Sequence, residues 1–235
     1  MWVMRLSKHA RLKSGLLSYK DRWIAKQPMK RFGTPVFACI VMVIIVMVLA
    51  SIEPLDWSSY LLHQAGTVVF MAMVVICYRY LPVRVSSFIM ATVFIIVHII
   101  GARYLYSYVP YSDWSQSVFG WSIDEQFGWQ RNMYDRLVHF CYGLLLFGLM
   151  YDVFKAWFKS ASYSQLIFLV LLFNMATSAL YELFEWSLAM TMSPADAEAY
   201  NGQQGDMWDA HKDMALALLG GIISAVLKIL NAKTK

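Results

Sequence analysis

Charged residues make up only 15% of this 235-residue chain, and its cysteines number three. A soluble domain carries about 25% charged residues, so this chain has too few to cover a globule that faces water. Cys39, Cys77 and Cys141 stand singly in apolar runs, which excludes a disulfide scaffold and a cysteine metal cluster. Hydrophobic residues reach 59%. These proportions exclude a soluble enzyme, a disordered tail and a secreted disulfide-rich domain, and they predict an integral membrane protein.

Six apolar segments predict an all-α fold class, a polytopic bundle of six transmembrane helices. A helix rises 1.5 Å per residue, so about 20 residues cross a hydrocarbon core of ~30 Å. Four segments are long enough by themselves: 35–52, 60–77, 85–102 and 163–181. The segments 137–151 and 214–227 are shorter, and we expect them to extend to about residues 157 and 230. They span only if their polar ends also enter the helix.

The distribution of Lys and Arg predicts that both termini are cytoplasmic. Sixteen of the 20 basic residues fall on one side of the predicted spans with two acids, and the other four share the opposite side with thirteen acids. Basic loops of membrane proteins stay on the cytoplasmic side, so the acidic loops face outward. The net charge of +5 therefore reflects an asymmetry across the membrane and indicates no nucleic-acid partner. The partners that we expect are membrane lipids.

We expect one transmembrane domain with short appendages. Residues 1–34 form a basic cytoplasmic N-terminal arm, which either lies on the inner leaflet as an amphipathic helix or is a simple positive anchor. Residues 35–230 form the six-helix domain, with an aromatic outer-face loop at 103–134 that covers its outer end as a lid. Residues 231–235 are a cytoplasmic tail.

Ionisable residues gather near the predicted outer ends of three helices. They are rare in membranes and mark functional sites by default. Asp135 and His139 lie four residues apart on one helix face, and Glu182 and Glu185 lie three apart on another. If the last helix begins at Asp206, one stripe of it carries three acids. The predicted polar cluster also includes further residues: Arg103, Asn132, Arg136, Asp206, Asp209 and Asp213.

Several carboxylates in a low-dielectric cluster must share protons, pair with arginine or hold a cation. An oxygen-rich site with one imidazole suits Mg²⁺, Mn²⁺, Fe²⁺ or Zn²⁺. The predicted divalent-metal ligands are Glu182, Glu185, Asp209 and Asp213, and the predicted catalytic residues are His139 and Glu185.

Structural roles compete with this interpretation. Asp135 and Asp206 stand where helix caps occur. Capping does not account for Glu182 and Glu185, because acids at a helix C-terminus are disfavoured. A structural pairing with Arg103, Arg131 or Arg136 is the alternative explanation for them.

The motifs at these positions resemble those of a known family. They are Asn132-x-x-Asp135-Arg136-x-x-His139-Phe140, Tyr181-Glu182-x-x-Glu185-Trp186 and Gly202-x-Gln204-Gly205-Asp206-x-Trp208-Asp209. This set, over residues 80–225, resembles the YjdF-like family of uncharacterised bacterial inner-membrane proteins, and more distantly VanZ-like proteins. The resemblance implies a membrane fold and location but no reaction. Arg103 stands where the family has histidine, and His211 where it has glutamine.

Three functions remain open at this stage. The first is a metal-dependent enzyme that modifies a lipid or envelope intermediate at the outer leaflet, with His139 as general base. The second is a proton-coupled transporter of small solutes. Two observations count against it: the acids lie at one face of the membrane rather than at its midplane, and no inverted repeat is visible. The third is a non-catalytic membrane protein in which an acid and arginine network ties helices together.

Overall fold

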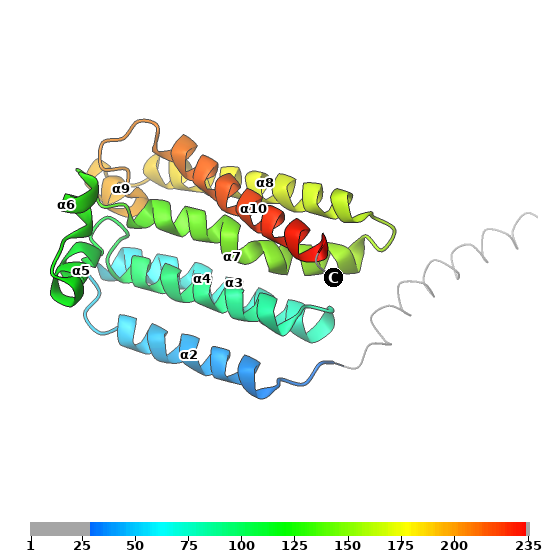
Figure 1. The fold of residues 1–235 in the computed structure, drawn as a ribbon. Helices are drawn as coiled ribbons and strands as arrows, with labels where there is room; N and C mark the ends of the chain where they lie inside the picture. Colours follow the sequence, from blue (N-terminus) through cyan, green and yellow to red (C-terminus); the bar gives the residue numbers. More distant parts are fainter. Residues whose placement is uncertain (1–28, 234–235) are drawn as a thin grey trace, which may run out of the picture. The chain divides into compact units, whose positions relative to one another are not determined.

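The computed structural model describes residues 29–233 of a chain that divides into two units, 1–31 and 32–235. The predictions for most of the N-terminal arm and for the last two residues lie outside the described part. Within that part the fold is all-helical (Figure 1), as the composition predicts. Its helices are α2 (Thr34–Ala50), α3 (Trp57–Tyr80), α4 (Val85–Arg103), α5 (Tyr111–Phe119), α6 (Ile123–Phe127), α7 (Tyr134–Trp157), α8 (Tyr163–Ala189), α9 (Pro194–Asn201) and α10 (Asp209–Lys233).

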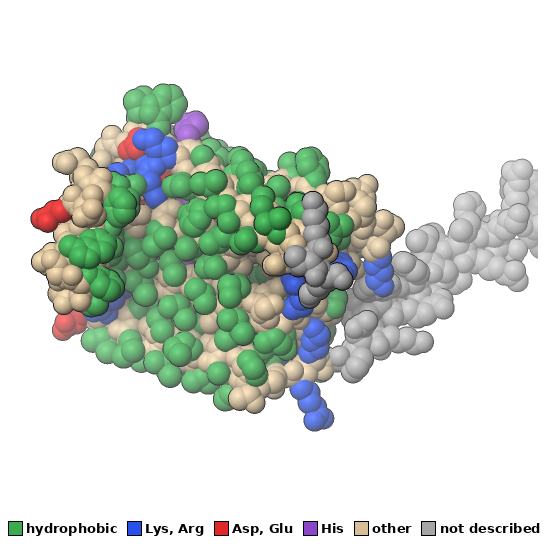
Figure 2. Space-filling view, in the orientation of Figure 1, with side chains coloured by type: hydrophobic (Ala, Val, Ile, Leu, Met, Phe, Trp, Pro, Cys, Tyr) green, Lys and Arg blue, Asp and Glu red, His purple; other side chains and the backbone are tan. Residues whose placement is uncertain are grey.

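Five of these helices are long and apolar enough to cross a membrane: α3, α4, α7, α8 and α10. The helix α2 is apolar but has 17 residues, the lower end of the length that spans. Side chains on the visible face are apolar over its middle, and acidic ones lie at the end that carries α5 and α6 (Figure 2). The chain is thus a multi-pass helical protein, and α2 as a sixth span stays a prediction.

Local sequence signals set the ends of several helices. The Asp56 carboxylate caps α3 by accepting a hydrogen bond from the backbone N–H of Ser59 at 2.7 Å. Ser162 and Gln165 form a reciprocal capping box at the start of α8. Gly120 and Gly128 end α5 and α6 with positive φ angles of 78° and 67°, which glycine adopts without steric cost.

The helix α7 is the centre of the bundle and packs against α4, α8 and α10. The largest core cluster lies between these helices and includes three side chains with almost no exposed surface, Phe88, Leu146 and Val170. By contrast, α4 is the one helix against which α2 packs extensively in the described part of the chain. Residues on α7, α8 and α10 are therefore held in fixed register, which matters for the polar groups that these helices carry.

Two glycines let α7 and α10 approach until their backbones touch. A Cβ at Gly143 would lie 1.8 Å from the carbonyl oxygen of Ala217, and one at Gly220 would lie 2.2 Å from the carbonyl oxygen of Phe140. Small residues allow such close packing between membrane helices. The contact lies within two turns of His139 on α7 and of Asp213 on α10, so it fixes how closely these two side chains meet.

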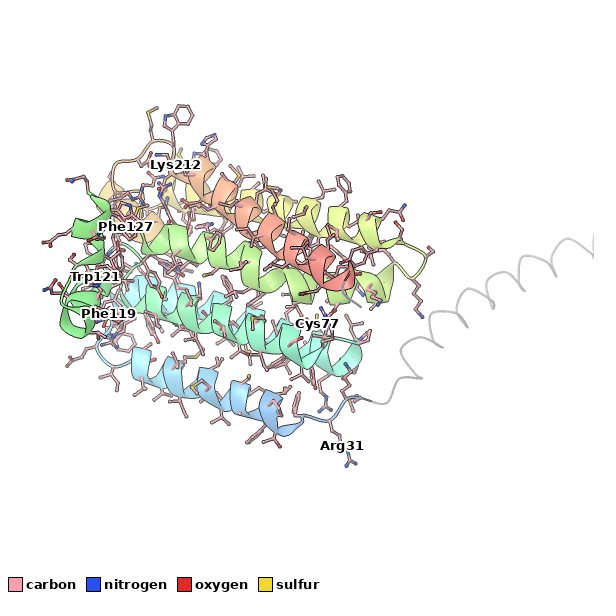
Figure 3. The ribbon with its side chains drawn as sticks, viewed as in Figure 1. Arg31, Cys77, Phe119, Trp121, Phe127 and Lys212 are labelled. Atoms are coloured by element: carbon pink, nitrogen blue, oxygen red, sulfur yellow. The ribbon has the colours of Figure 1, made fainter. Side chains whose placement is uncertain are left out.

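The three short helices lie at one end of the bundle, and Figure 1 shows α5, α6 and α9 together there. In Figure 3 the labelled side chains Phe119, Trp121, Phe127 and Lys212 lie at this end and Cys77 at the opposite one. The predicted lid loop thus contains two helices, α5 and α6. The helix α9 was not predicted at all, because its polar sequence has no apolar periodicity.

Candidate functional site

Three side chains from α7 and α10 meet at the end of the bundle that carries the short helices. Asp135, His139 and Asp213 each offer one donor atom, and these atoms lie within 4.8 Å of one another. All three residues are buried. The Nε2 atom of His139 is 3.7 Å from Oδ1 of Asp135. Asp213 is 1% exposed, and its Oδ1 has no hydrogen-bond partner among the described residues.

Glu182 joins this group from α8. Its Oε1 atom is 3.7 Å from Nδ1 of His139, longer than a hydrogen bond, and has no partner among residues 29–233. The Glu182 side chain is only 9% exposed. Glu185 lies one turn further along α8. We call Asp135, His139, Glu182 and Asp213 the carboxylate centre.

The two remaining acids of the predicted cluster are neutralised by arginine. Oδ1 of Asp209 accepts hydrogen bonds at 2.7 Å from both Arg131 and Arg136. Oδ2 of Asp206 pairs with Arg136 at 2.8 Å and with Lys212 at 2.6 Å. Asp209 therefore has its charge compensated by two guanidinium groups, unlike Asp213 on the same helix. The residues that the sequence predicted as one polar cluster form two separate groups in the structure: the carboxylates of one group pair with arginine, and those of the other do not.

The structure places Asp206 and Arg103 differently from the sequence-based prediction. Asp206 does not belong to α10, which begins at Asp209, because a turn with positive φ at Gln204 and Gly205 precedes it. Arg103 donates to the carbonyl oxygens of Leu49, Ala50 and Ile52 at the end of α2, and thus to no carboxylate of the centre.

Asn132 holds the loop before α7 in place rather than joining the centre. Its side chain donates to the carbonyl of Val109 at 2.8 Å and accepts from the backbone N–H of Tyr134. Its backbone exchanges two hydrogen bonds with the side-chain amide of Gln204. The motif residue Gln204 thereby ties the turn before α10 to the start of α7.

A cavity of about 390 Å³ opens beside the centre, between α8, α9 and the start of α10. Its polar wall contains Glu182, Glu185, Asn201, Gln203 and Asp209, and its apolar wall contains Ala179, Leu183, Trp186, Ala210 and Met214. Leu183 and Trp186 are more than half exposed on the surface of a candidate span. Pockets for small molecules and cofactors have volumes of about 300–1,000 Å³, and this cavity has room for such a ligand.

A second polar group of side chains, which sequence reasoning did not assemble, lies in the interior between α3, α4 and α9. The Tyr106 hydroxyl and Nδ1 of His98 are 2.6 Å apart. The His63 ring stacks on that of Tyr200 with centroids 4.3 Å apart. Burial raises the pKa of Tyr106 far above its usual value, and nearby Asp135 adds to the increase. In the sequence, His63 and His98 stand near one end of two apolar segments, which is a signal that could have indicated this group, but Tyr200 lies on the unpredicted α9.

The unpaired centre is suited to hold a divalent cation. Ligand atoms of one Zn²⁺ ion, bound at 2.0–2.2 Å, are at most about 4.4 Å apart, so small side-chain rotations bring the donors into range. Two carboxylates and one imidazole suit Mn²⁺, Fe²⁺ or Zn²⁺. Without a cation or protons, the buried acids repel one another.

The fold and this site define a multi-pass membrane protein with a polar centre at one end of its helices. The chain belongs to a family described as predicted membrane proteins, DUF2238, which matches residues 35–233. It is similar to "Inner membrane protein YjdF" of Escherichia coli (strain K12), with 27% identity over 182 residues that cover 77% of this chain and 83% of the relative. No solved structure matches the chain. The family predicted from the motifs is therefore confirmed.

Proposed function

We propose that this protein is a metal-dependent enzyme of the bacterial inner membrane that modifies a lipid or a lipid-linked envelope intermediate at the outer leaflet. The observation that carries the proposal is the convergence of Asp135, His139 and Asp213 within 4.8 Å, with Oδ1 of Asp213 unpartnered among the described residues. A structural network would satisfy that oxygen, as the two arginines satisfy Asp209.

The proposed ligand set changes from the one expected from sequence. Asp135, His139 and Asp213 hold the cation, because their donor atoms already lie together. Asp209 is omitted, since two arginines occupy its Oδ1. Glu185 is omitted as a ligand and stays in the site as a wall of the cavity.

The roles of the remaining residues follow from their positions. His139 becomes a ligand, so it is not free to act as the general base. Glu182 takes that role, because it lies between the cavity and the centre and its Oε1 is free to accept a proton. A divalent cation in the centre supplies Lewis-acid polarisation of a phosphoryl or carbonyl oxygen and promotes ionisation of water.

The proposal includes an orientation of the chain in the membrane. The asymmetry of Lys and Arg supports six spans with both termini cytoplasmic and α5, α6 and α9 at the outer face. The carboxylate centre then lies at the level of the outer leaflet, where the exposed Leu183 and Trp186 beside the cavity contact lipid. An amphiphile reaches such a site from the bilayer, without crossing water.

The test is the metal content of detergent-purified protein, measured by mass spectrometry for the wild type and two variants. We expect about one divalent ion per chain in the wild type and its loss in Asp213→Asn. The matched control is Asp206→Asn, which removes one carboxylate of the arginine-paired group and should retain the ion. Loss in both variants, or no ion bound by metal-reconstituted wild type, would contradict the proposal.

A further inference from the structure

The cavity between α8, α9 and α10 has a wall of hydrogen-bond acceptors. Glu182 and Glu185 contribute carboxylates, and Asn201 contributes a side-chain carbonyl. Asn201 is 5% exposed, its Nδ2 donates to the backbone carbonyl of Glu185 at 3.4 Å, and its Oδ1 has no partner among the described residues. Oε1 of Glu182 is likewise unpartnered within that part. Among the described residues that line the cavity, the buried side-chain atoms without a partner are therefore all hydrogen-bond acceptors. A matching ligand supplies hydrogen-bond donors.

The charge of the wall sharpens this conclusion. Glu182 and Glu185 make no ion pair with Lys or Arg in the described structure. The guanidinium groups of Arg131 and Arg136 are bound to Asp206 and Asp209. An anionic group on the wall side would meet uncompensated carboxylates, whereas a cationic donor would neutralise them. A primary ammonium carries one positive charge and three donors.

Apolar residues also line the cavity. They include Ala179, Leu183, Met214 and Trp186, and Trp186 is 61% exposed. A ligand that fits both walls has an ammonium head and a hydrocarbon tail that leaves along α8 into the bilayer. The exposed indole also offers a face for cation–π contact with such a head.

We propose that this cavity binds the primary ammonium head of a membrane amphiphile, held between the Glu185 carboxylate and Oδ1 of Asn201, with its chain along Leu183 and Trp186. This ligand class rests on the proposed function in so far as the amphiphile is the substrate of the carboxylate centre. Binding itself needs no catalysis, and it is therefore measurable by itself.

The experiment uses the full chain in nonionic detergent and two probes with the same tail and charge. Dodecylammonium has three N–H donors, and dodecyltrimethylammonium has none. We expect the protein to bind dodecylammonium at least tenfold more tightly, as measured by calorimetric titration below the micelle concentration of either probe. Equal binding of the two probes, or no saturable binding of dodecylammonium, would overturn the proposal.

Variants locate the site. Glu185→Gln should weaken dodecylammonium binding about tenfold, and Asn201→Asp, which adds a carboxylate at the proposed contact, should strengthen it. The matched control is Glu125→Gln on α6, which removes one exposed outer-face charge away from the cavity and should leave binding unchanged. Ala179→Trp fills the apolar wall and should abolish saturable binding; wild-type affinity in Ala179→Trp and in Glu185→Gln would place the ligand elsewhere.

The two proposals fail separately. If the metal-reconstituted wild type holds no ion while dodecylammonium still binds selectively, the ligand class stands and the enzymatic role falls. If the metal binds stoichiometrically and dodecylammonium does not bind, the centre stands and the substrate class is wrong. The metal content of Glu185→Gln is a further check, because this variant should keep its ion.

Discussion

Replacing Asp213 by asparagine should change the stability of the protein in opposite directions with and without metal. In the metal-free protein, Asp213 and Asp135 carry donor oxygens within 4.8 Å of each other, and Oδ1 of Asp213 is unpartnered among the described residues. Two unit charges at that distance repel by about 3 kcal/mol at an effective dielectric constant of about 20. Asp213→Asn removes this repulsion and keeps the size of the side chain, so the chelated variant should melt at a higher temperature than the chelated wild type.

In the presence of metal the order should reverse. An ion at 100 times its dissociation constant stabilises the folded state by about 2.7 kcal/mol, and the variant loses a ligand for it. Thermal melting in detergent, recorded for both proteins with EDTA and with excess Mn²⁺ or Zn²⁺, gives the four midpoints required. The expected result is a crossing: the variant is more stable with EDTA, and the wild type is more stable with metal. Parallel shifts, or wild-type midpoints identical with and without chelator, would refute the reasoning and favour a purely structural acid network.

The remaining predictions address packing, pH and topology. Gly143→Ala should separate α7 from α10, cost about 1–3 kcal/mol of folding stability by overpacking and lower the affinity for metal. Gly66→Ala is the control and should retain the ion, because an added Cβ there meets nothing within 4 Å. Equal metal affinity in the two variants would contradict this packing effect. The Lys212 ammonium and the Trp208 backbone N–H lower the pKa of Asp206. The ionised carboxylate therefore stabilises the fold at pH values above its unfolded pKa of about 3.9, and this stabilisation is lost as the pH falls through the folded pKa. The difference in melting midpoint between wild type and Asp206→Asn should shrink on acidification, and a constant difference would disprove this linkage. Reporter fusions at Lys235 and within residues 193–205 should report the cytoplasm and the outside respectively, and the same side for both would end the six-span topology.

The long apolar helices were predictable because long apolar runs have few alternatives in a bilayer. The predicted 85–102 segment agrees with Val85–Arg103 to within a residue. The two uncertain segments proved to be full helices, α7 and α10, which include polar residues at their N-terminal ends. The helix α9 escaped prediction, since its polar residues carry no periodic apolar signal and are held by tertiary contact with α8.

The site was predictable by residue type and depth but not by pairing. The sequence indicated that acids and one histidine from three helices share a level, and the structure brings His139, Glu182 and Asp213 together. It could not reveal that Arg131 and Arg136 pair with Asp206 and Asp209, because those contacts join residues 70 to 78 positions apart. The ion pairs of the two arginines determine which carboxylates stay unpaired, and these ion pairs depend on the conformation of the turn before α10.

Pulsed electron paramagnetic resonance of the Mn²⁺-loaded protein shows whether the carboxylate centre binds a metal ion through His139. Coordination by His139 should give one directly bound ¹⁴N coupling, because the proposed ligand set contains a single imidazole nitrogen. His139→Ala should lose that coupling, and His211→Ala, which changes an exposed histidine at the same end of the bundle, should retain it. A bound Mn²⁺ ion with no nitrogen coupling in the wild type, or with one that survives His139→Ala, would contradict the account.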